Sequence, residues 1–125
     1  MSGSRWVKLG PAADIAPGKT GDFQLDDHSI LVANCDGTYF AIEDRCTHDD
    51  GPLAQGRLSR CQIECPRHGA KFDMKTGKAL TLPAFSPVAA YPVRETDDGV
   101  LEVDLGVMKP AARFEDPRGT FTIGT

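Results

Sequence analysis

Residues 45–72 read RCTHDDGPLAQGRLSRCQIECPRHGAKF and carry the strongest chemical signal in the chain. They contain two short motifs, Cys46-Thr47-His48 and Cys65-Pro66-Arg67-His68-Gly69, and each places a thiol and an imidazole on one tight loop. The sixteen residues between them, 49–64, are enough for a hairpin that brings the two loops together. Thiolates and imidazoles are ligands of borderline-soft transition metals, so the stretch predicts a metal centre where the loops meet.

The sequence on both sides of this stretch is typical of β-strands joined by tight turns. Asp36-Gly37 and Asp97-Asp98-Gly99 are strong hairpin signals, because Asp and Gly tolerate positive φ. Apolar and acidic residues alternate over 100–105, as expected for a half-buried strand. The predicted strands are Trp6–Leu9, Ser29–Cys35, Thr38–Asp44, Ser86–Glu95 and Val100–Leu105, and residues 45–72 are predicted to be irregular.

The composition is that of one globular domain rich in turns. The 125 residues are 40% hydrophobic and 26% charged, and 13 glycines and 9 prolines favour short strands over long helices. A net charge of −4 argues against binding to nucleic acid. We expect no membrane span, because no apolar run reaches about 18 residues. The N-terminal MSGSRWVKLG lacks the apolar core of a signal peptide, so a cytoplasmic location is predicted.

The remaining cysteines and the third histidine have no motif of their own. In a reducing cytoplasm, cysteines are expected to be thiols or metal ligands. Cys35 and Cys61 are therefore predicted to be buried thiols, and nothing in the sequence supports a disulfide between them. His28, beside two aspartates, is predicted to be a solvated turn residue.

The pattern C-x-H, a spacer of about sixteen residues and C-x-x-H resembles the signature of the Rieske iron–sulfur family. The resemblance extends over about residues 5–105 and includes GAKFDMKTGKAL and the loop Leu82–Pro87. It implies an all-β fold in which an antiparallel β-sandwich base carries an inserted cluster-binding subdomain. The implied division of the single domain 1–125 is a base of 5–44 and 73–106, a cluster-binding subdomain of 45–72 and a tail of 107–125.

By the same resemblance, the chain binds one [2Fe–2S] cluster. Cys46 and Cys65 would hold the inner iron, and His48 and His68 the outer iron near the surface. Two Fe³⁺, two sulfides and two thiolates sum to zero charge, which makes reduction easier than in all-cysteine clusters. The same four residues could instead form a zinc site, but the C-x-H loop is tighter than usual zinc spacings.

The sequence also indicates a low potential within the family. Rieske proteins of cytochrome complexes have a disulfide between the ligand loops, whereas the matching positions here are Gly51 and Arg67. Those proteins also carry a serine and a tyrosine that donate hydrogen bonds to sulfur, where this chain has Ala70 and Phe72. Missing donors leave the reduced cluster less stabilised, so we predict a potential near about −150 mV, the low end of the Rieske range.

The resemblance implies a soluble ferredoxin that carries single electrons and is not itself an enzyme. It would pass electrons from an NAD(P)H-dependent flavin reductase to a terminal non-heme iron oxygenase of the ring-hydroxylating dioxygenase type. Charged residues near the ligands are either an ordinary surface or a docking rim for these partners. The chain is expected to be a monomer or weak oligomer. Three alternatives stay open: a role in cluster assembly, redox sensing, or similarity to the small subunit of nitrite reductase.

Overall fold

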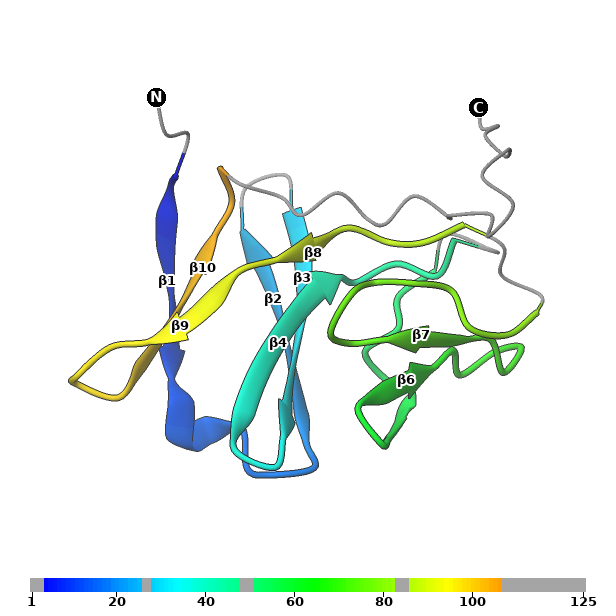
Figure 1. The fold of residues 1–125 in the computed structure, drawn as a ribbon, viewed down its shortest axis with the longest axis horizontal. Coiled ribbons are helices and arrows are strands. Elements are labelled where there is room, and N and C mark those ends of the chain that lie inside the picture. Colours follow the sequence, from blue (N-terminus) through cyan, green and yellow to red (C-terminus); the bar gives the residue numbers. More distant parts are fainter. Residues whose placement is uncertain (1–3, 26–27, 48–50, 83–85, 107–125) are drawn as a thin grey trace.

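The computed structural model describes residues 4–25, 28–47, 51–82 and 86–106, and this part of the chain is built from short antiparallel strands (Figure 1). The prediction of an all-β fold is confirmed. Apart from a 3-10 turn, η1 (Ala12–Asp14), the elements are β1 (Trp6–Pro11), β2 (Thr20–Leu25), β3 (His28–Cys35), β4 (Thr38–Glu43), β5 (Arg57–Ser59), β6 (Gln62–Glu64), β7 (Lys71–Asp73), β8 (Ala90–Tyr91), β9 (Val93–Glu95) and β10 (Val100–Asp104).

Two sheets form the base of the molecule. One has the strand order β1-β10-β9 and the other the order β2-β3-β4-β8. In the described residues a third, smaller sheet, β5-β6-β7, lies beside them (Figure 1). The chain enters the smaller sheet after β4 and returns to the base at β8, and these two strands pair directly, with Ile42 opposite Ala90. The segment 44–89 is therefore an insertion between two neighbouring strands.

Strand β3 is the centre of the structure because both of its faces are buried. Ile30 and Val32 pack in a core with Leu101 from the other base sheet. Leu31 and Ala33 point to the opposite side, into a second core shared with residues of the insertion. Successive side chains of a strand face opposite ways, so an uninterrupted apolar run is what a strand between two cores requires.

The second core joins the insertion to the base. Its fully buried members from the insertion and its edges include Leu53, Ile63, Phe72, Met74 and Val88. The backbones of Gly77 and Val88 lie close together in this region. A Cβ atom at Gly77 would overlap the carbonyl oxygen of Val88, and φ of Gly77 is +81°. The amide of Val88 donates a 2.8 Å hydrogen bond to the carbonyl of Gly77, so the two backbones are in direct contact.

The turns follow the sequence prediction closely. Asp36 and Gly37 both have positive φ, 57° and 96°, and they connect the paired residues Cys35 and Thr38 of β3 and β4. Gly99, with φ of 77°, closes the turn between β9 and β10. Four of the predicted strands, over 6–9, 29–35, 38–44 and 100–105, agree with the structure to within a few residues.

Other predictions on the strands were wrong. The region 86–95 is not one strand, because the chain changes from one sheet to the other at Pro92, between β8 and β9. Strand β2 was not predicted, since TGDFQL has too few apolar residues for a clear pattern. Residues 45–72 are not wholly irregular, because β5, β6 and part of β7 lie within them. The tail, 107–125, lies outside the described residues.

No helix in the described part of the chain is long and apolar enough to cross a bilayer.

Candidate metal centre

The first candidate ligand loop follows β4. Cys46 is fully buried, and its amide donates a 2.7 Å hydrogen bond to the carbonyl oxygen of Gly51, which closes the loop. Thr47 ties the loop to the returning chain, because its hydroxyl donates a 2.6 Å hydrogen bond to the carbonyl of Ser86. His48, the predicted histidine ligand of this loop, lies outside the described residues.

The second candidate loop connects β6 to β7. Cys65 is 1% exposed, and its amide donates a 2.6 Å hydrogen bond to the carbonyl oxygen of Ala70. Gly69, with φ of 79°, allows the chain to turn back, and its own amide donates to the carbonyl of Cys65. His68 lies on this loop and is exposed to solvent.

The two loops are thus closed in the same way. In each, the amide of the predicted cysteine ligand donates to the carbonyl five residues further along the chain. Sequence analysis did not identify this repeated closure, because the two loops share few residues besides the ligands. The shared geometry holds both thiols at the base of a loop.

The structure brings the two predicted cysteine ligands into one buried environment. Cys46 and Cys65 belong to the same apolar core, and neither forms a disulfide. Buried thiols on one side and an exposed imidazole, His68, on the other match the donor set that a [2Fe–2S] cluster with mixed ligands needs. In the described residues taken alone, no group of three or more His, Cys, Asp or Glu side chains is arranged around one ion.

A direct contact joins the two loops. Arg67 Nη1 donates a 2.8 Å hydrogen bond to the carbonyl oxygen of Pro52. Gly51 makes room for it, because a Cβ atom there would lie 2.6 Å from Cζ of Arg67. Positions 51 and 67, where high-potential relatives carry the disulfide, therefore face each other, and here an arginine side chain spans them.

The acidic residue before the first loop is held by the loop that follows it. Asp44 Oδ1 accepts a 2.7 Å hydrogen bond from the amide of Leu53. Burial raises the pKa of the Asp44 carboxyl, while the Leu53 amide and the charge of Arg67 act in the opposite direction. The amide of Asp44 also donates to the carbonyl of Ser29, so this residue fixes the loop to the edge of β3.

The charged surface around the loops is mixed. Arg67 and Lys71 are exposed, whereas Arg45 is partly buried and paired with Glu43 at 2.9 Å. The positions that carry hydroxyl donors in high-potential relatives, Ala70 and Phe72, are fully buried. Apolar atoms therefore occupy those positions in the core beside Cys65.

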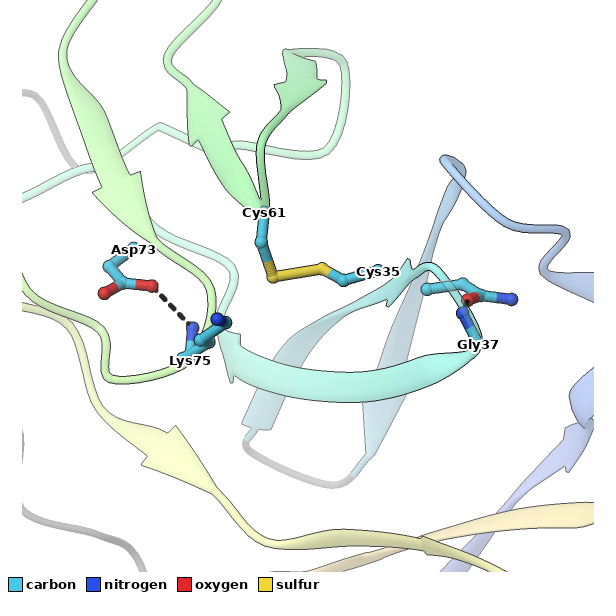
Figure 2. Close-up of a disulfide and its surroundings, with 6 residues drawn as sticks. Cys35, Gly37, Cys61, Asp73 and Lys75 are labelled. Carbon is cyan, nitrogen blue, oxygen red and sulfur yellow. Dashed lines mark hydrogen bonds between the residues drawn. A yellow bond between two sulfur atoms is a disulfide. The ribbon is translucent and has the colours of Figure 1, made fainter.

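The prediction for Cys35 and Cys61 was wrong, since these residues form a disulfide (Figure 2). Their Cα atoms are 5.5 Å apart, although the residues are 26 positions apart in sequence. Each lies at the turn of a hairpin, and the two turns meet. In the sequence only Cys35 stands beside a predicted tight turn, Asp36-Gly37, and that signal does not show which distant segment the turn touches.

The prediction for His28 was also wrong. This residue begins β3 and is partly buried, and its ring packs edge-on against Tyr91 with the centroids 6.2 Å apart. We expected solvent around this ring because of the adjacent aspartates, but an aromatic neighbour on β8 covers part of it.

Comparison with known proteins agrees with this fold and identifies the family. Residues 5–92 match the model of the Rieske [2Fe-2S] domain. The chain is 40% identical over 102 residues to the ferredoxin component of biphenyl 2,3-dioxygenase from Rhodococcus jostii (strain RHA1), covering 81% of this chain and 95% of that protein.

Solved structures from dioxygenase systems have the same fold as this chain. The ferredoxin of carbazole 1,9a-dioxygenase from Nocardioides aromaticivorans IC177 superposes with a TM-score of 0.75 at 29% identity, covering 80% of this chain and 97% of that one. A ferredoxin chain in a complex of reduced oxygenase and oxidized ferredoxin in carbazole 1,9a-dioxygenase gives 0.74 at 30% identity, covering 79% and 92%.

The chain therefore belongs to the Rieske [2Fe–2S] family. Its cofactor is one [2Fe–2S] cluster. Within the family it is a ferredoxin of the type found in dioxygenase systems, an electron carrier and not an enzyme, as predicted.

Proposed function

We propose that this ferredoxin accepts electrons one at a time from a flavin-containing, NAD(P)H-dependent reductase and passes them to a terminal non-heme iron oxygenase that hydroxylates aromatic rings. The observation that carries the proposal is the pair of similarly closed loops, with Cys46 and Cys65 buried and His68 exposed. The carbazole dioxygenase complex supports the second half, because there a ferredoxin of the same fold is bound to its oxygenase.

We propose Cys46, His48, Cys65 and His68 as the ligands. When bound, the cluster supplies reversible uptake of one electron at a neutral centre. The apolar core around the two cysteines excludes water from the thiolate side. His68 faces solvent, so its side of the proposed cluster is the one on which we propose that electrons enter and leave.

The proposed division of the chain into a base, a cluster-binding subdomain and a tail follows from this ligand set. We propose 5–44 and 73–106 as the base, 45–72 as the cluster-binding subdomain and 107–125 as a tail. In the strand topology the stretch 73–89 lies within the insertion, and the core shared by Leu31, Ile42, Ile63 and Phe72 fixes the ligand loops to the base. A cytoplasmic location and a monomeric or weakly associating state are part of the same proposal, because NAD(P)H is supplied in the cytoplasm.

The test uses purified, cluster-loaded protein with the reductase of a biphenyl dioxygenase system, NADH and cytochrome c as the final acceptor. We expect cytochrome c reduction that depends on this protein and is lost in the His68→Ala variant. Reduction of the protein by dithionite but not by any flavin reductase would overturn the assignment of the electron donor.

The ligand set is tested separately by spectroscopy. We expect a red-brown protein that, after dithionite reduction, gives an EPR signal with an average g below that of all-cysteine clusters. A colourless protein that contains zinc would overturn the ligand proposal.

A further inference from the structure

The Cys35–Cys61 disulfide connects the tips of two hairpins that belong to different parts of the molecule (Figure 2). Cys35 is the last residue of β3, directly before the Asp36-Gly37 turn of the base. Cys61 lies in the two-residue turn between β5 and β6 of the small sheet. Strand β6 leads from Cys61 to the candidate ligand Cys65. The disulfide therefore restrains the strand that directly precedes this ligand.

The disulfide is accessible to a reagent. Both half-cystines are only partly buried, and they line a cleft of about 400 Å³ between the base and the insertion. The exposed side chains of Asp36, Arg60 and Lys75 line the same cleft. Thiol–disulfide exchange requires a nucleophile to reach one of the sulfurs, and this opening provides the path.

The charges in the cleft favour the exchange. Two cations, Arg60 and Lys75, lie in its wall against one carboxylate, Asp36. A positive environment stabilises the thiolate that leaves when a disulfide is attacked, and a better leaving group is displaced faster. This setting differs from that of an inert structural disulfide enclosed in apolar atoms.

The backbone at Cys61 is held in a conformation that its sequence does not favour. Arg60 and Cys61 have φ of 55° and 61°, in the left-handed region that two-residue hairpins normally fill with Asn and Gly. The carbonyl of Cys61 also accepts a 2.9 Å hydrogen bond from the amide of Met74. Cleavage of the disulfide removes one of the restraints on this turn, so the hairpin tip can relax.

We propose that Cys35–Cys61 is a redox-active disulfide whose reduction by a dithiol loosens the cluster-binding region from the base. A thiolate of the dithiol attacks one sulfur, the S–S bond breaks, and a mixed disulfide forms as the other protein sulfur leaves. The second thiolate of the dithiol resolves this intermediate. Overall, two electrons and two protons convert the protein disulfide to two thiols while the dithiol becomes a cyclic disulfide.

This step is separate from one-electron transfer at the cluster, and it depends neither on the proposed partners nor on the proposed location. Because Cys61 and Cys65 are joined by β6, the oxidised state holds the second ligand loop against the base. The reduced state frees the hairpin, and the cluster becomes easier to remove. The thiol state of the protein would then control how long the cluster is retained.

The experiment uses anaerobic, cluster-loaded protein equilibrated in buffers of reduced and oxidised dithiothreitol. Alkylation with iodoacetamide and mass spectrometry would count the free thiols at positions 35 and 61, and visible absorbance would follow cluster loss to an iron chelator. We expect alkylation at both positions under mild reducing conditions and cluster loss about tenfold faster than from the oxidised protein.

Two variants separate the effect of the disulfide on cluster loss from the effect of Arg60 on disulfide reduction. A Cys35→Ser/Cys61→Ser double variant should lose its cluster at the fast rate whether or not dithiothreitol is present. Arg60→Gln should slow reduction of the disulfide without changing cluster loss once the thiols are free. A disulfide that resists reduction in the folded protein, or equal rates of cluster loss before and after reduction, would overturn the proposal.

Discussion

Arg67 Nη1 lies 2.8 Å from the carbonyl oxygen of Pro52, and this hydrogen bond joins the two candidate ligand loops. The arginine side chain crosses Gly51, which has no side chain to obstruct it. In the Rieske proteins of cytochrome complexes, from which this sequence differs here, a disulfide joins the matching positions. Here a non-covalent contact takes its place, and such a contact breaks more easily.

Arg67→Ala should therefore loosen the ligand loops without unfolding the protein. A hydrogen bond from a guanidinium to an exposed carbonyl contributes at most about 1 kcal/mol, or a factor of about 5 in an equilibrium. We expect faster cluster loss to a chelator by about that factor, measured by visible absorbance. Arg57→Ala on β5 serves as a control for loss of an exposed arginine, and equal rates in the two variants would contradict the prediction.

The histidine ligands can be separated from the structural histidine by substitution. His48→Ala and His68→Ala should each abolish the normal cluster, because one iron loses a nitrogen ligand. His28→Ala should retain it, since His28 lies at the start of β3 in the base and packs against Tyr91. EPR of the three reduced variants shows whether each retains the cluster. A normal signal from His68→Ala would remove this residue from the ligand set.

Ala70→Ser and Phe72→Tyr should each raise the midpoint potential. Both positions are fully buried, so a new hydroxyl there would donate where no water competes. A hydrogen bond that favours the reduced state by about 1.4 kcal/mol raises a one-electron potential by about 60 mV. Redox titration followed by circular dichroism gives the value, and no shift in either variant would show that these hydroxyls do not set the potential here.

The proposed histidine ligation also predicts a pH-dependent potential. Reduction raises the proton affinity of metal-bound imidazoles, so electron and proton binding are linked. At alkaline pH, where the oxidised form loses these protons, the potential should fall as the pH rises. Voltammetry across this range tests the prediction, and a flat profile would argue against histidine ligands.

Gly77→Ala should be strongly destabilising, for two reasons that a second variant separates. At Gly77 the left-handed φ and the overlap with the Val88 carbonyl both oppose a side chain, whereas Gly18 has a similar φ of +84° and open space around it. Gly18→Ala should cost about 1–2 kcal/mol of unfolding free energy, and Gly77→Ala about 3 kcal/mol or more. Urea denaturation of the two variants measures the difference between their unfolding free energies. Equal losses of unfolding free energy would show that the contact between Gly77 and the Val88 carbonyl is unimportant.

The parts of the fold that sequence analysis predicted are those governed by local rules. Asp36-Gly37 forms the expected turn because both residues accept positive φ, and the apolar run 30–33 forms the expected strand. The ligand motifs indicated a cluster site because the chemistry requires those residue types close together along the chain. Local preference and tertiary structure agree at this turn and in this strand.

The features that were missed depend on contacts between distant segments. The Cys35–Cys61 disulfide forms because two hairpin tips meet, and no pattern near either cysteine encodes that meeting. The same holds for the contact of His28 with Tyr91. Strand β2 was missed for another reason: it pairs along its whole length with residues 28–33 of β3, and this pairing stabilises a sequence with weak strand preference of its own.

Because β4 and β8 are hydrogen-bonded to each other, the length of the segment inserted between them can vary without moving either strand. The first and last residues of this segment leave and rejoin the sheet at neighbouring points, so a replacement segment would have to span only the width of a strand pair. Loop-closure entropy rises slowly with loop length, and the base would therefore tolerate inserts of quite different sizes. Ligand loops from another member of the family could be grafted at this junction, provided that the graft supplies apolar side chains to cover Leu31 and Ala33 of β3.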